Sequence, residues 1–106
     1  TFNENVSGPV IGFKIANDQG AYITGTNSRL ISVDTGEYEK GSKMQFSWVI
    51  PNIFSTGKHT ISIAVATKQD ETLDSWNDAI GFQVTKRQKT PYITDPRVEL
   101  AIEGIK

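Results

Sequence analysis

The chain has no cysteine and only one histidine, His59, among its 106 residues. Small secreted domains often depend on disulfides, so the absence of cysteine favours a reducing compartment. Zinc sites are built mainly from cysteine and histidine, and this chain cannot supply such a set. No apolar run reaches the length of about 18 residues that a membrane-spanning helix needs, and we expect no signal peptide within these residues.

Motifs of catalytic sites are also missing. His59 could serve a Ser-His-Asp triad, but no serine lies in a Gly-x-Ser-x-Gly turn, so we predict an exposed or half-buried strand residue. Residues 20–25 lack the Gly-Lys-Ser/Thr ending of a phosphate-binding loop. Asp34, Glu37 and Glu39 have no apolar flank of the kind that raises the pKa of a glycosidase acid. We expect no enzyme activity, no catalytic residue and no cofactor.

The charged residues give little support for a nucleic-acid or metal-ion partner. The net charge is −1 and the basic residues are dispersed, whereas a nucleic-acid partner needs a basic face. Asp70, Glu71, Asp74 and Asp78 are close in sequence and offer the oxygen ligands that calcium prefers. Their spacing is not that of an EF-hand, because Ser75 occupies the position of the required glycine. We predict a solvated acidic loop, no metal site and no nucleic-acid binding.

Apolar and polar residues alternate with a period of two along much of the chain, and helical periodicity is absent. The alternation is clearest at 43–50, where Met44, Phe46, Trp48 and Ile50 share one face. The predicted strands are 11–16, 21–26, 43–50, 59–67, 79–85 and 98–102, with a short strand or strand extension at 30–33 and a charged loop at 68–78. Six or seven strands without a helix predict a single domain over residues 1–106, an immunoglobulin-like or jelly-roll β-sandwich of antiparallel strands.

The end of the chain differs from the rest. Residues 86–96 are polar and contain two prolines, so we predict a connector. A C-terminal strand is predicted over 97–104, and its apolar Val98, Leu100 and Ile102 need a partner surface. We predict a homodimer in which this strand is exchanged between chains. The alternative is that the strand folds onto its own domain, since sequential strands usually pair locally.

One ordered series of motifs covers residues 8–85. It comprises Ile15-Ala16-Asn17-Asp18-Gln19-Gly20, Ile23-Thr24-Gly25-Thr26-Asn27, Gly41, the strand ending before Pro51, Gly57 to Thr67, the acidic residues 70–74, Trp76 and Phe82-Gln83-Val84. The series resembles the C-terminal polysaccharide-binding domain of Wzt-type ATP-binding subunits of bacterial ABC transporters that export O antigen. His59 departs from it, since the family usually has tyrosine there. Only residues 1–8 precede the Pro9 region, where family domains carry one or two strands, so the chain resembles a truncated fragment or a smaller variant.

The resemblance implies a non-catalytic carbohydrate-binding domain that recognises O-antigen polysaccharide for export. It also implies an ATPase domain on the same full-length polypeptide and a place in the cytoplasm, at the inner face of the bacterial inner membrane. Contact with the membrane would be indirect, through the transporter.

Sugar-contacting residues are expected opposite the core face of each strand. The candidate ligand-binding residues are Lys14, Tyr22, Thr24, Asn27, Arg29, Gln45, Ser47 and Gln83, with Ser62 as a further candidate. Trp48 is predicted to lie in the core, and Trp76 to be a packing anchor. Two other functions stay open: an extracellular immunoglobulin-like or fibronectin-like adhesion domain, and a sugar-binding module of a secreted glycosidase.

Overall fold

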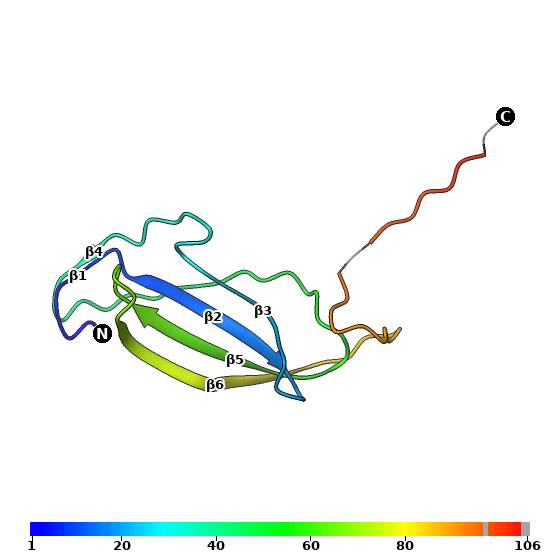
Figure 1. Cartoon of the computed structure of the whole chain (residues 1–106), viewed down its shortest axis with the longest axis horizontal. Coiled ribbons are helices and arrows are strands. Elements are labelled where there is room, and N and C mark those ends of the chain that lie inside the picture. Colours follow the sequence, from blue (N-terminus) through cyan, green and yellow to red (C-terminus); the bar gives the residue numbers. More distant parts are fainter. Residues whose placement is uncertain (97, 105–106) are drawn as a thin grey trace.

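The computed structural model describes residues 1–96 and 98–104, and within them every regular element is a β-strand. The main sheet has the strand order β3 (Tyr22–Asn27), β2 (Val10–Asn17), β5 (Gly57–Ala66) and β6 (Thr72–Val84) (Figure 1). A second, short ladder joins β1 (Val6–Ser7) to β4 (Glu37–Tyr38). All these pairs are antiparallel, which confirms the predicted all-β fold class.

The β2–β3 hairpin forms as the sequence predicts. Asn17 ends β2, and its side-chain Oδ1 accepts hydrogen bonds from the backbone N–H groups of Gln19 and Ala21. Gly20 takes a φ of +80°, a conformation that glycine adopts without steric cost. The Asn17 side chain and Gly20 together close the turn. Further along the hairpin, Gly25 lies opposite Lys14 in the ladder. A Cβ on Gly25 would lie only 2.8 Å from the Phe13 carbonyl oxygen.

The predicted charged loop at 68–78 is wrong in extent. The turn between β5 and β6 is short: Thr67 accepts hydrogen bonds at its hydroxyl from the N–H groups of Gln69 and Glu71. β6 already begins at Thr72 and continues to Val84. Its alternation is interrupted where the β5–β6 register shifts, and Asp78 there has a φ of +50°. Because the bulge interrupts the period-two alternation, the sequence pattern does not reveal the first part of β6.

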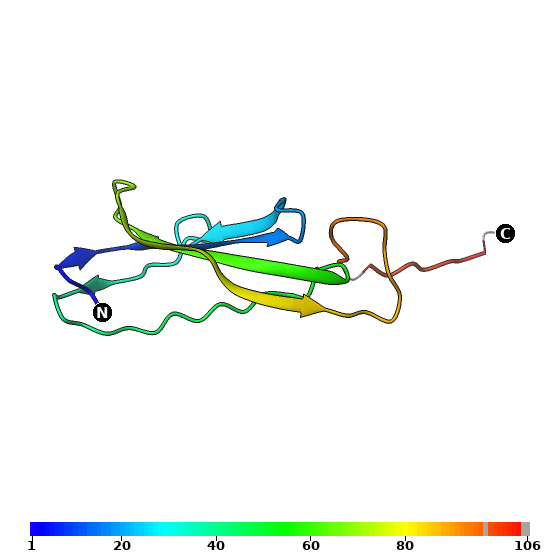
Figure 2. The same cartoon turned by 90° about the horizontal axis from the view of Figure 1, so that it is seen from below.

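Residues 43–50, called the extended segment below, form no strand in the described chain, so that prediction is wrong. The segment runs along one side of the main sheet as part of a second layer (Figure 2). Its apolar side does face the sheet, since the Trp48 ring packs edge-on against Phe13 with ring centroids 4.9 Å apart. Val49, on the opposite side, is 97% exposed. The sequence pattern therefore predicted the orientation of the segment correctly and its pairing incorrectly.

The core lies between these two layers. Ile11 and Ile15 of β2 are buried there, together with Phe54. His59 is also buried, at 2% exposure, which corrects the prediction of an exposed or half-buried residue. Its ring stacks on Phe82 at a centroid distance of 5.2 Å, because both residues lie opposite each other on the core side of the β5–β6 ladder.

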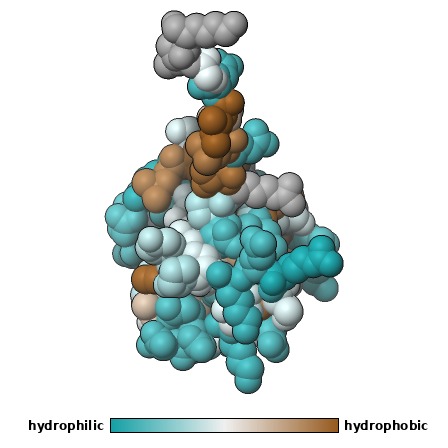
Figure 3. Space-filling model, turned by 90° about the vertical axis from the view of Figure 1, so that its right-hand side faces the viewer, coloured by the Kyte–Doolittle hydropathy of each residue, from teal (hydrophilic) through white to brown (hydrophobic). Residues whose placement is uncertain are grey.

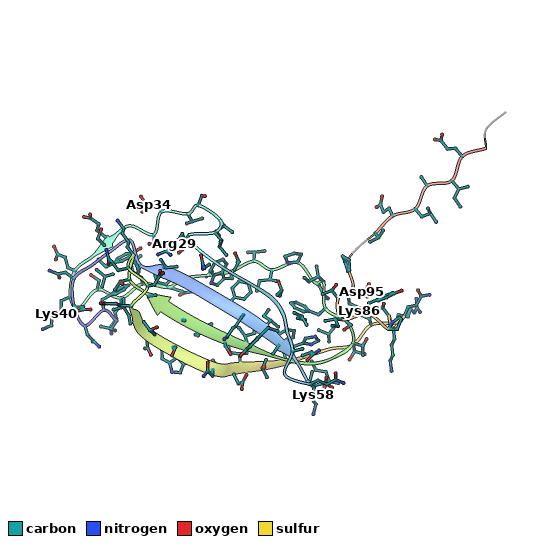
Figure 4. The ribbon with its side chains drawn as sticks, viewed as in Figure 1. Arg29, Asp34, Lys40, Lys58, Lys86 and Asp95 are labelled. Carbon is teal, nitrogen blue, oxygen red and sulfur yellow. The ribbon has the colours of Figure 1, made fainter. Side chains whose placement is uncertain are left out.

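The connector after β6 is fixed to the main body at its far end. Thr94 forms an isolated antiparallel bridge with Phe54, and Lys86 pairs with Asp95 at 3.0 Å (Figure 4). Residues 98–104 form no strand and lead away from the body (Figure 1). Residues 30–33 likewise form no strand, because 28–32 is a turn. The predicted C-terminal strand begins at Arg97, which lies outside the described residues.

Candidate functional site: the outer face of the main sheet

The main sheet has one face turned away from the extended segment, called the outer face below. In β2, Phe13 contacts Trp48 of the extended segment, so Lys14 points to the opposite side of the sheet. The register sets Lys14 opposite Ser62 of β5, and the same alternation brings Thr60 to this face. The outer face therefore carries hydroxyl and ammonium groups, whereas the other face carries the core.

A fixed polar cluster lies at the β6 side of the outer face. The backbone N–H of Asp78 donates to Ser62 Oγ at 2.9 Å, and Thr60 Oγ1 donates to Asp78 Oδ1 at 3.1 Å. Ser62 is 4% exposed, so its hydrogen bond with the Asp78 N–H holds the bulge against the sheet. Asp78 itself is exposed. The bulge thus positions a carboxylate over a sheet surface of small side chains.

An aromatic ring and a cation lie at the other side of the same face. Lys14 Nζ is 4.3 Å from the centroid of the Tyr22 ring, a cation–π distance. Tyr22 is 60% exposed, and the register sets it opposite Ala16 on the outer face. Only short side chains lie between this pair and Asp78 in the register: Ala16 of β2, and Thr60 and Ser62 of β5. The arrangement offers an exposed ring, an ammonium group and an oriented carboxylate on one surface.

The structure separates the predicted ligand residues into groups. Lys14, Tyr22 and Gln83 belong to the outer face, the last because it lies opposite Lys58 in the ladder. Thr24 lies opposite the buried Ile15, so it belongs to the core side.

The remaining candidates lie elsewhere or make structural contacts. Asn27 Oδ1 accepts a hydrogen bond from the Leu30 N–H at 2.9 Å and thereby stabilises the turn after β3. Arg29 donates to Asp70 Oδ1 and to the Lys68 carbonyl oxygen, each at 2.8 Å, and so joins two turns. The other two candidates, Gln45 and Ser47, are exposed on the extended segment, in the other layer.

Sequence reasoning missed Thr60 and Asp78 as members of this surface. Thr60 lay in a correctly predicted strand but was not selected, although it alternates with the apolar Ile61. Asp78 had been assigned to a loop, because the bulge breaks the alternation of β6. The loss of period two just before Ala79 was the only sequence signal for the bulge.

A separate hollow of about 470 Å³ lies on the core side of the sheet, near the start of β6. Its apolar lining includes Met44, Phe46 and Trp76, and the carboxylate residues Glu4 and Asp74 also line it. Trp76 is 54% exposed, which corrects the prediction of a packing anchor. Trp48, by contrast, is partly buried against Phe13, in line with its predicted core position.

Two further kinds of functional feature, a metal-binding group and a membrane-spanning helix, are absent from the described residues. Within residues 1–96 and 98–104, no three histidine, aspartate or glutamate side chains come together as a metal-binding group. In the same part of the chain, no helix has the length and apolar character needed to cross a membrane.

The fold defines an all-β domain of the β-sandwich class, with a polar face on its main sheet. The chain belongs to the Wzt C-terminal domain family, whose sequence profile matches residues 1–95. A crystal structure of the C-terminal domain of Wzt matches this chain with a TM-score of 0.85 and 23% sequence identity, which shows the common fold. That match covers 96% of this chain and 65% of the solved chain, so this chain spans just under two thirds of its relative. No curated protein matches the chain.

Proposed function

We propose that the chain is a non-catalytic carbohydrate-binding domain that recognises O-antigen polysaccharide for export by an ABC transporter. Membership of the Wzt C-terminal domain family supports the transporter context. From the same context we propose an ATPase domain on the full-length polypeptide and a cytoplasmic position at the inner membrane. Contact with the membrane would then be only indirect. The observation that carries the binding role is the combination of Tyr22, Lys14 and the oriented Asp78 on one open sheet face.

The chemistry of these groups suits a sugar polymer. The C–H face of a pyranose stacks on an exposed aromatic ring, and carboxylates and ammonium groups form hydrogen bonds with its hydroxyls. The second layer covers the opposite face of the main sheet (Figure 2), so the outer face is available to a chain-like ligand. Because such a surface recovers little beyond the cost of association, we expect a dissociation constant between about 1 µM and 1 mM. No metal or cofactor takes part in this binding.

The experiment is a calorimetric titration of the chain with the O polysaccharide of the producing strain. Tyr22→Ala and Asp78→Asn should each weaken binding about tenfold, because each removes one kind of contact from the outer face. Gln45→Ala is the control, since Gln45 is exposed on the other layer. Unchanged affinity in both outer-face variants would contradict the proposed site. The size distribution of the polymer must stay constant during incubation, and its shortening would contradict a non-catalytic role.

The domain is also proposed to be a homodimer that exchanges its C-terminal strand. The bridge between Phe54 and Thr94 is antiparallel, and the Asp95 N–H donates to the Ile53 carbonyl oxygen next to it. Continuing this register along the chain would set Val98, Leu100 and Ile102 opposite Ile50, Trp48 and Phe46. Opposite residues of an antiparallel pair share a face, so two apolar rows would meet.

The positions of the two rows favour exchange between copies. Val98, Leu100 and Ile102 are 82–87% exposed. Apolar side chains gather on the part of the molecule that projects from the body (Figure 3). The extended segment belongs to no ladder within the described chain. Exchange recreates between two copies the pairing that a closed monomer would make within one. The segment and the projecting residues therefore complement each other.

A further inference from the structure

The hollow beside Trp76 is distinct from the outer face. In the β5–β6 ladder, Trp76 lies opposite Ile63 and Asp74 lies opposite Val65. Ile63 in turn lies opposite Phe13, which contacts the extended segment, so these residues belong to the core side of the sheet. The hollow is thus separated from Tyr22 and Lys14 by the sheet itself. A ligand in one of the two sites does not touch the other.

The lining of the hollow combines an apolar wall with negative charge. Met44, Phe46 and Trp76 supply exposed apolar and aromatic surface, at 51%, 39% and 54% exposure. Glu4 and Asp74 supply two carboxylates; the lining has no lysine, arginine or histidine side chain, and its one cationic group is the α-amino group of Thr1. Within the described chain, neither carboxylate takes part in an ion pair. Asp74 Oδ1 accepts one hydrogen bond, from the backbone N–H of Ser75 at 2.9 Å, and the two carboxylates otherwise remain available to a ligand.

A volume of about 470 Å³ lies within the range of small-ligand pockets, roughly 300–1,000 Å³. An aromatic ring attracts both the C–H face of a pyranose and a nearby cation. Two unpaired carboxylates favour an ammonium group and repel a carboxylate or phosphate group. A pyranose with a free amino group satisfies ring, size and charge together.

We propose that the hollow binds an amino sugar, with its ring against Trp76 and its ammonium group at Asp74 and Glu4. This site is independent of polysaccharide binding on the outer face. Acidic sugars and phosphate-bearing sugars are excluded from it by the same carboxylates. Salt weakens the interaction, because the Debye length falls from about 10 Å at 0.1 M to about 3 Å at 1 M ionic strength.

The test compares two probes that differ in one group: a tetrasaccharide of glucosamine and the corresponding tetrasaccharide of N-acetylglucosamine. Each is titrated into the intact chain at pH 6 and low salt, with tryptophan emission and calorimetry as readouts. The glucosamine probe should change the emission and bind at least tenfold more tightly than the acetylated probe. Equal affinities, or no binding of the glucosamine probe, would overturn the proposal.

Variants locate the binding. Asp74→Asn should reduce the preference for the amine about tenfold, and Asp18→Asn in the β2–β3 turn is the matched control. Trp76→Phe should remove the emission change, while Trp48 still reports a folded protein. A full response in Asp74→Asn or in Trp76→Phe would place the sugar elsewhere and overturn the assignment.

Tyr22→Ala separates this site from the proposed polysaccharide site. The variant should bind the glucosamine probe as the original chain does, even though it binds O polysaccharide more weakly. Loss of the probe in Tyr22→Ala would show a single outer-face site and contradict a separate hollow. Loss of O-polysaccharide binding alone leaves the amino-sugar site intact and concerns only the outer face.

Discussion

The main sheet and the extended segment show the same alternation in sequence but differ in structure. β2 pairs with β3 on one side and β5 on the other, and its Ile15 is 1% exposed. The extended segment has equally regular alternation, yet within the described chain it pairs with no strand, and its Phe46 is 39% exposed. Alternation reports which side of a chain is covered, whereas pairing depends on a neighbouring strand. The comparison therefore identifies the second layer as the place where a partner strand is expected.

The largest difference should appear in stability. Ile15→Ala removes buried side-chain volume from the main sheet, so it should lower the free energy of unfolding by about 2–5 kcal/mol. Val49→Ala on the extended segment should change it by less than about 0.5 kcal/mol, since Val49 is 97% exposed. Denaturant titration of both variants measures the two effects. Similar losses would show that the second layer is as closely packed as the first.

Association tests the second layer directly. Leu100→Asp places a charge in the row that is proposed to pair with Trp48, so it should weaken dimerisation at least about 100-fold by burying an unpaired charge. Light scattering at tens of micromolar should show a dimer for the intact chain and a monomer for this variant. Glu99→Gln is the control, because Glu99 alternates with the apolar row. A monomeric intact chain would refute stable exchange, and a dimeric Leu100→Asp variant would place the interface elsewhere.

The smallest effect concerns the two turns that Arg29 joins at one end of the main sheet. Its ion pair with Asp70 is exposed on both sides, at 49% and 73% side-chain exposure. Such pairs contribute about 0.2–1 kcal/mol, so Arg29→Ala should reduce stability only within that range. O-polysaccharide affinity should not change, although Arg29 was predicted from the sequence as a ligand residue. A selective loss of affinity at constant stability would show that Arg29 contacts the polysaccharide.

The sequence predicted the main sheet well where side chains determine the backbone locally. Asn17 and Gly20 make the β2–β3 turn by their own hydrogen bonds and conformation, so the hairpin was predictable. The burial of His59 was also accessible, since His59 alternates in step with Ile61 and Ile63. Those signals depend only on neighbouring residues.

The errors arise where distant residues decide the structure. The start of β6 was missed because the bulge at Asp78 depends on Ser62 and Thr60, which lie in another strand. Pairing of the extended segment was wrongly expected, because alternation cannot tell a paired strand from an unpaired one. The predicted ligand set mixed the outer face, core side and second layer for the same reason. Side-chain type alone did not show that Gln45 and Lys14 lie on different layers.

The most direct test of the central claim is to map the O polysaccharide onto the chain by amide chemical shifts in solution. We expect perturbations on the outer face, at Lys14, Tyr22, Thr60, Ser62 and Asp78, that saturate with a common dissociation constant. The amides of residues 43–50 should not move with that constant. Perturbations confined to the extended segment, or none at saturating polymer, would contradict the assignment of the outer face as the carbohydrate-binding surface.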